Sequence, residues 1–216
     1  MTFTPEDAQK LLDIIRARRD VRGNRFITKP VEDEKLEMIL QAAMAAPSVG
    51  YSQPWRFIII DDLPTKERIL KNFQIENQKA KSIFIDQPLY AKLKLEGIKE
   101  APINIAVLYE PNEEAVLGMT SMNRMGEYSV VCAIQNMWLM ARALNIGMGW
   151  VSILDAQKVL QTLNIKPPTQ LIAYLCVGYV DYFYAESELK TLGWEEEKGL
   201  DESLIYRSSK KSTSTI

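Results

Sequence analysis

Histidine is absent from all 216 residues of the chain. This absence excludes catalytic triads built on histidine, histidine general acids and bases, and histidine metal ligands. Any proton transfer must therefore use other side chains.

The chain also lacks an apolar run near the roughly 20 residues of a membrane span. Its first residues contain no basic segment followed by a hydrophobic one. Lysine plus arginine (26) nearly balance aspartate plus glutamate (28), which gives a formal net charge of -2. No basic field favours nucleic acid or an anionic membrane. We therefore expect a cytoplasmic protein that binds neither.

Cysteine is scarce, with two residues in the chain. Cys132 lies in a helical apolar pattern and Cys176 in a strand-like one. We expect both to be buried, reduced thiols that carry no chemistry.

The remaining composition is that of a globular protein, with 47% hydrophobic and 25% charged residues. Apolar periodicity and end signals predict alternating helices and strands, and hence a mixed domain of two or three layers. Residues 75–101 mix apolar and charged positions without a clean period and predict a surface helix or a lid. Helices are predicted over 4–18, 36–46, 64–73, 127–145 (the longest) and after Asp155, and strands over 57–60, 103–109, 150–154 and 171–180.

The densest charged feature is the run Arg16-Ala17-Arg18-Arg19-Asp20-Val21-Arg22 at the end of the first helix. Guanidinium groups bind phosphate bidentately and are permanently charged, so this run can hold a phosphate group. The alternative is a solvated helix end whose cations oppose the helix dipole.

Two further segments suit a planar ligand. Residues 46–55, with Pro47, Ser48 and Gly50, form a rigid loop of small residues between a helix and a strand, or only a connector. Residues 147–152 place glycines between the long helix and a strand, with Ser152 expected near the start of that strand, or form only a structural turn.

Together, in this order and spacing, the three segments resemble the nitroreductase superfamily of FMN proteins over about residues 11–199. The resemblance implies an α+β fold with a central mixed sheet flanked by helices, assembled as a domain-exchanged homodimer that binds each FMN between its subunits. It implies one FMN-binding domain over 1–199 with a C-terminal arm around the partner. The polar stretch 200–216 is expected to be a disordered tail.

Within the superfamily the chain is similar to the aerobic 5,6-dimethylbenzimidazole synthases. Most nitroreductases have serine in place of Asp20, whereas these synthases carry Arg-Arg-Asp-Val-Arg, as at residues 18–22. Similar stretches recur at residues 46–50 with 53–55, 93–98, 100–102 and 149–152. One departure is that Gly193-Trp194 precedes three glutamates and Lys198, where the family has basic residues. Either Lys198 takes the place of the family's phosphate contact here, or that contact is missing.

The resemblance implies that reduced FMN is both cofactor and substrate, that dioxygen is the co-substrate, that a separate flavin reductase supplies reduced FMN, and that no metal is required. Asp20 would transfer protons, and Ser152 would donate a hydrogen bond near the reactive ring atoms. Alternatively, Asp20 is only an ion-pair partner of an arginine. The implied FMN-binding residues are Arg18, Arg19, Asp20, Val21, Arg22, Pro47, Ser48, Met148, Gly149, Trp150 and Ser152.

Two other functions remain open from the sequence. In a conventional flavin reductase, bound FMN would pass electrons from NAD(P)H to a second substrate. In a non-catalytic module, the protein would store or sense FMN.

Overall fold

The computed structural model of the chain describes residues 1–207 and divides it into two compact units, 1–185 and 186–216. The boundary falls inside the stretch 1–199 that the sequence predicted as one domain with an arm. Most of the predicted disordered tail, residues 208–216, lies outside the described residues.

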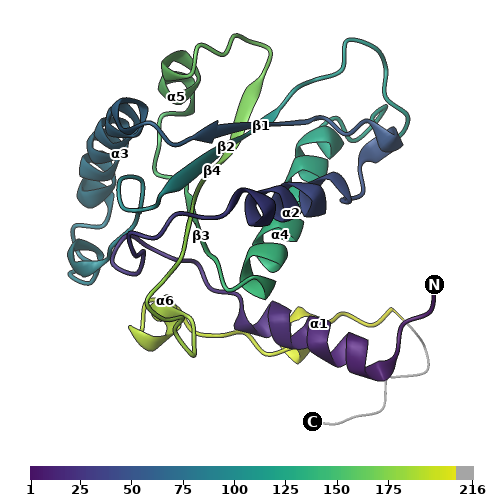
Figure 1. Cartoon of the computed structure of the whole chain (residues 1–216), viewed down its shortest axis with the longest axis horizontal. Coiled ribbons are helices and arrows are strands. Elements are labelled where there is room, and N and C mark those ends of the chain that lie inside the picture. Colours follow the sequence, from purple (N-terminus) through teal and green to yellow (C-terminus); the bar gives the residue numbers. More distant parts are fainter. Residues whose placement is uncertain (208–216) are drawn as a thin grey trace. The chain divides into compact units, whose positions relative to one another are not determined.

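The first unit contains a four-stranded sheet in the order β1-β2-β4-β3 (Figure 1). Every neighbouring pair of these strands is antiparallel, so the prediction of a mixed sheet was wrong for them. One parallel pairing is an isolated bridge between Asp20 and Met148 at the edge. Apolar periodicity does not encode strand direction, which depends on the path of the connections. The strands are β1 (Trp55–Ile60), β2 (Ile103–Tyr109), β3 (Gly147–Val151) and β4 (Gln170–Gly178).

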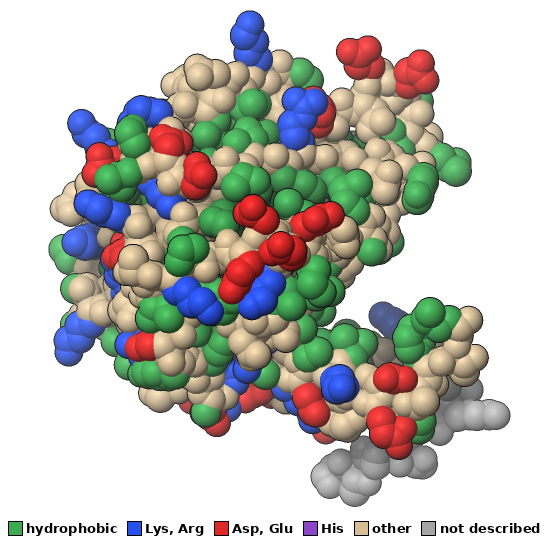
Figure 2. Space-filling view, viewed as in Figure 1, with side chains coloured by type: hydrophobic (Ala, Val, Ile, Leu, Met, Phe, Trp, Pro, Cys, Tyr) green, Lys and Arg blue, Asp and Glu red, His purple; other side chains and the backbone are tan. Residues whose placement is uncertain are grey.

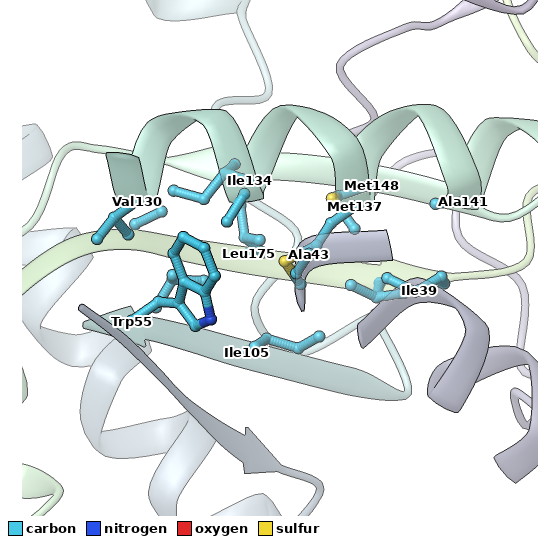
Figure 3. Packing of buried hydrophobic residues seen from close by; sticks show 14 of the residues in the cluster. Ile39, Ala43, Trp55, Ile105, Val130, Ile134, Met137, Ala141, Met148 and Leu175 are labelled. Carbon is cyan, nitrogen blue, oxygen red and sulfur yellow. The ribbon is translucent and has the colours of Figure 1, made fainter. Parts of the chain in front are cut away.

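Helices cover both faces of the sheet, so the unit has three layers. One face packs against α2 (Asp33–Met44) and α4 (Met125–Ala143), and Ile39, Ala43, Ile134 and Leu175 belong to the buried cluster between them (Figure 3). The other face packs against α3 (Leu63–Ile83) and α5 (Ala156–Thr162). Successive residues of β2 and β4 alternate between these cores, as strand geometry requires.

End signals in the sequence explain where the helices begin. Thr4 and Asp7 form a capping box at the start of α1 (Pro5–Ala17), and Asp155 accepts a hydrogen bond from the Lys158 N–H at the start of α5. Helix α2 is amphipathic. Its acidic side chains lie on the exposed side, where Figure 2 shows acidic residues gathered over the position of α2.

Three predictions about helices and thiols need correction. Helix α3 does not end near residue 73 but continues to Ile83, and it is longer than α4. Its last turns expose Ile75 and Ile83, so no apolar stripe marks them. Cys132 is exposed on α4, while Cys176 is buried as expected, and burial raises the pKa of its thiol.

The strand predicted over 150–154 is also misplaced. Strand β3 begins at Gly147 and ends at Val151. The glycines are therefore strand residues, and Ser152 follows the end of the strand instead of lying near its start.

The second unit contains the short helix α6 (Glu188–Thr191) and a 3-10 turn at Asp201–Ser203. Lys190 pairs with Glu186 and Glu197 and so joins the two ends of its exposed, charged segment. Among the helices of residues 1–207, none combines the length and apolar character of a membrane span.

Candidate functional site

The segment that follows α1 is attached to strand β3. The Val21 N–H donates to the Met148 carbonyl at 3.0 Å, and the Trp150 N–H donates to Oδ1 of Asp20 at 3.0 Å. Five predicted site residues, Asp20, Val21, Met148, Gly149 and Trp150, are thereby brought together, although about 130 positions separate the two segments in the sequence.

Glycine at position 149 makes this approach possible. A Cβ atom there would lie 1.9 Å from the Val21 carbonyl oxygen, which is inside van der Waals contact, and 3.5 Å from Oδ1 of Asp20. At Gly147 a Cβ would lie 2.5 Å from a methyl group of Val180. The sequence suggested that these glycines make room for a ligand. In the structure, the missing side chain at Gly149 makes room for the Asp20–Val21 segment.

Asp20 also forms an ion pair with Arg22, in which Oδ2 contacts Nη2. The Nη1 group of Arg22 donates to the carbonyls of Leu95, at 3.2 Å, and Trp150, at 3.0 Å. The ion pair that the sequence left as an alternative is present. It selects Arg22 from the neighbouring arginines as the partner of Asp20.

The segment Leu93–Ile98 lies against these residues. The Gly23 N–H donates to the Glu96 carbonyl at 2.8 Å. The Glu96 side chain is 8% exposed, pairs with Lys94, and accepts from the Ile98 N–H at 2.8 Å. This part of residues 75–101 is therefore a half-buried to buried, non-helical segment beside the site, and not a surface helix. The segment shows no regular hydrophobic periodicity because specific polar contacts hold it in place.

The arginines at the end of α1 bind backbone carbonyls that the helix leaves without partners. Nη1 of Arg19 donates to the carbonyls of Arg16, at 2.6 Å, and Arg18, at 2.7 Å. Nε of Arg142, at the end of α4, donates to the Ala17 carbonyl at 2.9 Å. Arg19 therefore bonds the carbonyl end of α1, and its part in phosphate binding stays a prediction.

Arg18 has a different environment. Its guanidinium carbon lies 4.8 Å from the centre of the Trp138 ring, and Nε1 of Trp138 donates to the Arg19 carbonyl at 3.1 Å. Burial and then the positive charge of Arg19 lower the pKa of Arg142. The positive charges of Arg19 and Arg142 repel one another, so an anion bound beside them would be stabilised. Sequence reasoning missed Trp138 and Arg142 as site residues, because they belong to a helix that is remote in sequence.

The Pro47–Ser48 loop is ordered by its own contacts. Oγ of Ser48 accepts from the Gln53 N–H at 3.1 Å, and the Val49 N–H donates to Oγ of Ser129 at 3.0 Å. Gly50, Tyr51 and Gln53 have φ angles of 56°, 54° and 45°. Two of these are strained non-glycine residues, a condition that often accompanies ligand sites.

Within one chain, the loop and the arginine segment contact opposite ends of α4. Ser129 anchors the loop and Arg142 anchors the end of α1, and 13 residues at about 1.5 Å each separate them by about 20 Å. The structure therefore brings Arg18 to Arg22 together with Met148 to Trp150, but it does not bring Pro47 and Ser48 to them. Ser152 is exposed, two residues beyond Trp150.

Comparison with known proteins assigns the family. The model of the nitroreductase family matches residues 15–179, and the chain belongs to that family. It is 38% identical over 200 residues to a 5,6-dimethylbenzimidazole synthase of Rhodospirillum rubrum, covering 91% of this chain and 94% of that protein.

Solved structures share the fold. A putative nitroreductase of Desulfovibrio desulfuricans in complex with FMN is 23% identical with a TM-score of 0.67, covering 96% of this chain and 99% of that one. An iodotyrosine deiodinase bound to FMN and 3-iodo-L-tyrosine is 22% identical with a TM-score of 0.69, covering 92% and 99%.

Proposed function

We propose that the protein is an oxidoreductase that binds reduced FMN and converts it, with dioxygen, into 5,6-dimethylbenzimidazole. The observation that carries this proposal is the placement of Asp20. Its carboxylate lies at the edge of β3, between the Trp150 N–H and Arg22. Similarity to the Rhodospirillum rubrum synthase over 91% of the chain supports the same reaction.

The residues at the end of α1 suit FMN. The flavin carries a phosphate dianion, and Arg18 and Arg142 lie beside Arg19, whose Nε is buried without a hydrogen-bond partner among the described residues. Arginine is the side chain best matched to phosphate. We therefore assign the phosphate and ribityl chain to Arg18 and its neighbours, and the ring edge to Asp20, Trp150 and Ser152.

Reduced FMN supplies the electrons that activate dioxygen and the carbon atoms of the product. The protein's own groups then have three tasks. Arg18 binds the anion, the Asp20 carboxylate accepts and returns protons at the ring edge, and the Ser152 hydroxyl donates a hydrogen bond there. Because the flavin is consumed, a separate flavin reductase must supply reduced FMN.

A homodimer would complete each site. The described residues bury no side chain of α1, and the exposed fractions of its Leu11 and Ile15 are 53% and 42%. Helix α4 likewise exposes Tyr128 at 45% and Val131 at 42%. A twofold pairing through these apolar faces would bring Pro47 and Ser48 of one chain near the arginines of its partner, whereas within one chain the two segments contact opposite ends of α4.

The dimer is tested by mass measurement of the FMN-loaded protein at micromolar concentration. A dimeric mass is expected, together with dissociation and loss of FMN in Val131→Glu, which places a charge in the apolar face. The matched control is Glu34→Gln on the exposed side of α2. A monomeric mass with FMN still tightly bound would contradict the proposed assembly.

The catalytic assignment is tested by Asp20→Asn, which keeps the side-chain size but removes the charge and most of the proton affinity. Product formation should fall by about 10²-fold or more, with a much smaller change in flavin affinity. Ser152→Ala should give a milder loss. Asp13→Asn, at an exposed position in α1, is the control. Near wild-type product formation by Asp20→Asn would remove the proton-transfer role.

A further inference from the structure

The Arg22 side chain has three polar contacts beside Asp20. Its Nη2 pairs with Asp20, and its Nη1 donates to two carbonyls from different parts of the chain, Leu95 and Trp150. The arginine side chain is 18% exposed. Its guanidinium plane is therefore defined by three acceptors that belong to the site itself.

We propose that Arg22 is a positioning residue of the reaction: it holds the Asp20 carboxylate in its working orientation, and the Leu93–Ile98 segment fixes Arg22. This role rests on the proposed function. It differs from the FMN-phosphate role that the arginine run first suggested. The phosphate role stays with Arg18, whose contact is an aromatic ring and not a carboxylate.

The geometry favours arginine over any other cation at this position. The N–H groups of the planar guanidinium point outward in fixed directions, so Nη2 can bind Asp20 while Nη1 binds the two carbonyls. A lysine ammonium is a point charge on a flexible stem. It could neutralise Asp20, but it could not hold the carboxylate and both carbonyls in one plane.

The anchor of Arg22 is itself held firmly. Leu95 is followed by Glu96, whose carbonyl accepts from the Gly23 N–H and whose buried carboxylate accepts from the Ile98 N–H. The Oδ1 atom of Asp20 is fixed separately by the Trp150 N–H. Each oxygen of Asp20 therefore has an assigned partner, and Arg22 links the carboxylate to the Leu93–Ile98 segment.

The first test compares Arg22→Gln with Arg18→Gln for binding of oxidised FMN. Arg22→Gln should change the dissociation constant by less than about threefold, whereas Arg18→Gln should raise it by about tenfold or more, the scale of a lost charged hydrogen bond. Equal losses of affinity in the two variants would make Arg22 an FMN ligand and overturn the positioning role.

The second test is a double-mutant cycle on product formation with Asp20→Asn. Arg22→Gln alone should lower the rate by about 10-fold to 100-fold, and Arg22→Lys should recover only part of it. In the Asp20→Asn background, Arg22→Gln should cost less than about twofold, because the carboxylate it positions is gone. If the rate loss of the double variant equals the product of the two single losses, or if Arg22→Lys restores the full rate, the proposal is wrong.

A third measurement does not depend on activity. In the apoprotein, Arg22→Gln removes the cation that pairs with the Asp20 carboxylate, so the double variant Asp20→Asn/Arg22→Gln should lose less in melting temperature than the sum of the two single variants. Additive losses in melting temperature would show that the two side chains are not coupled. If the unmodified protein forms no dimethylbenzimidazole, the proposed function fails, and this measurement still decides whether Arg22 holds Asp20.

Discussion

The substitution Gly149→Ala tests the contact on which the site is built. The new methyl carbon would lie 1.9 Å from the Val21 carbonyl oxygen, a backbone atom that cannot rotate away. The Asp20–Val21 segment must therefore move off strand β3, by more than 1 Å to reach ordinary contact.

That movement breaks two hydrogen bonds of 3.0 Å, from the Val21 N–H to Met148 and from the Trp150 N–H to Asp20. The neutral bond contributes about 0.5–1.5 kcal/mol and the charged one about 1.5–3 kcal/mol. Replacing glycine restricts the unfolded chain, which offsets about 0.4–1 kcal/mol. The expected loss in unfolding free energy is therefore roughly 1–4 kcal/mol.

Urea unfolding at fixed protein concentration measures this loss, and FMN titration measures its effect on the site. The control is Gly199→Ala, where a Cβ would come no closer than 3.3 Å to the Glu202 carboxylate. We expect the control to stay within about 0.5 kcal/mol of the original protein. Equal stability of the two variants would show that the close packing of Val21 on β3 is absent in solution.

Two further predictions concern charge. Arg18→Ala should weaken FMN binding by about 1.5–3 kcal/mol with the fold intact, measured as a dissociation constant; an unchanged constant would return the arginines to a helix-end role. The hydrogen bond from Tyr179, at 2.6 Å, is the largest cause that lowers the pKa of Glu32 from 4.5 to about 2. A lowered carboxyl pKa stabilises the folded state above the unfolded value, and this contribution disappears as the pH falls from 4.5 toward 2. Tyr179→Phe should therefore lower the melting temperature at pH 7 more than at pH 2.5, relative to Tyr182→Phe; an equal difference at both pH values would contradict the assignment.

The sequence was most informative where local chemistry determines structure. The N-cap at Thr4, the cap at Asp155 and the apolar run of β2 were visible as patterns, and the structure confirms them. The direction of the strands was not visible, because alternation looks the same in parallel and antiparallel sheets. The length of α3 was missed since its last turns bury no apolar face.

The site was predictable as a set of segments but not as a set of contacts. The run Arg18–Arg22 and the Gly-Met-Gly stretch could be singled out by composition, yet their mutual packing depends on the absence of a side chain at Gly149. The partner of Asp20 and the part played by Leu95 depend on tertiary placement. The family resemblance marked residues 93–98, and the structure supplies a physical reason for that match.

The measurement that tests the central claim most directly is a single turnover with protein in excess over reduced FMN. The protein is loaded without oxygen, mixed with air-saturated buffer, and its small molecules are identified by mass spectrometry. The proposal predicts that 5,6-dimethylbenzimidazole appears as FMN is lost, with much less product in Asp20→Asn. Quantitative recovery of oxidised FMN would contradict it, and steady NAD(P)H oxidation by the same preparation without loss of flavin would identify a conventional flavin reductase instead.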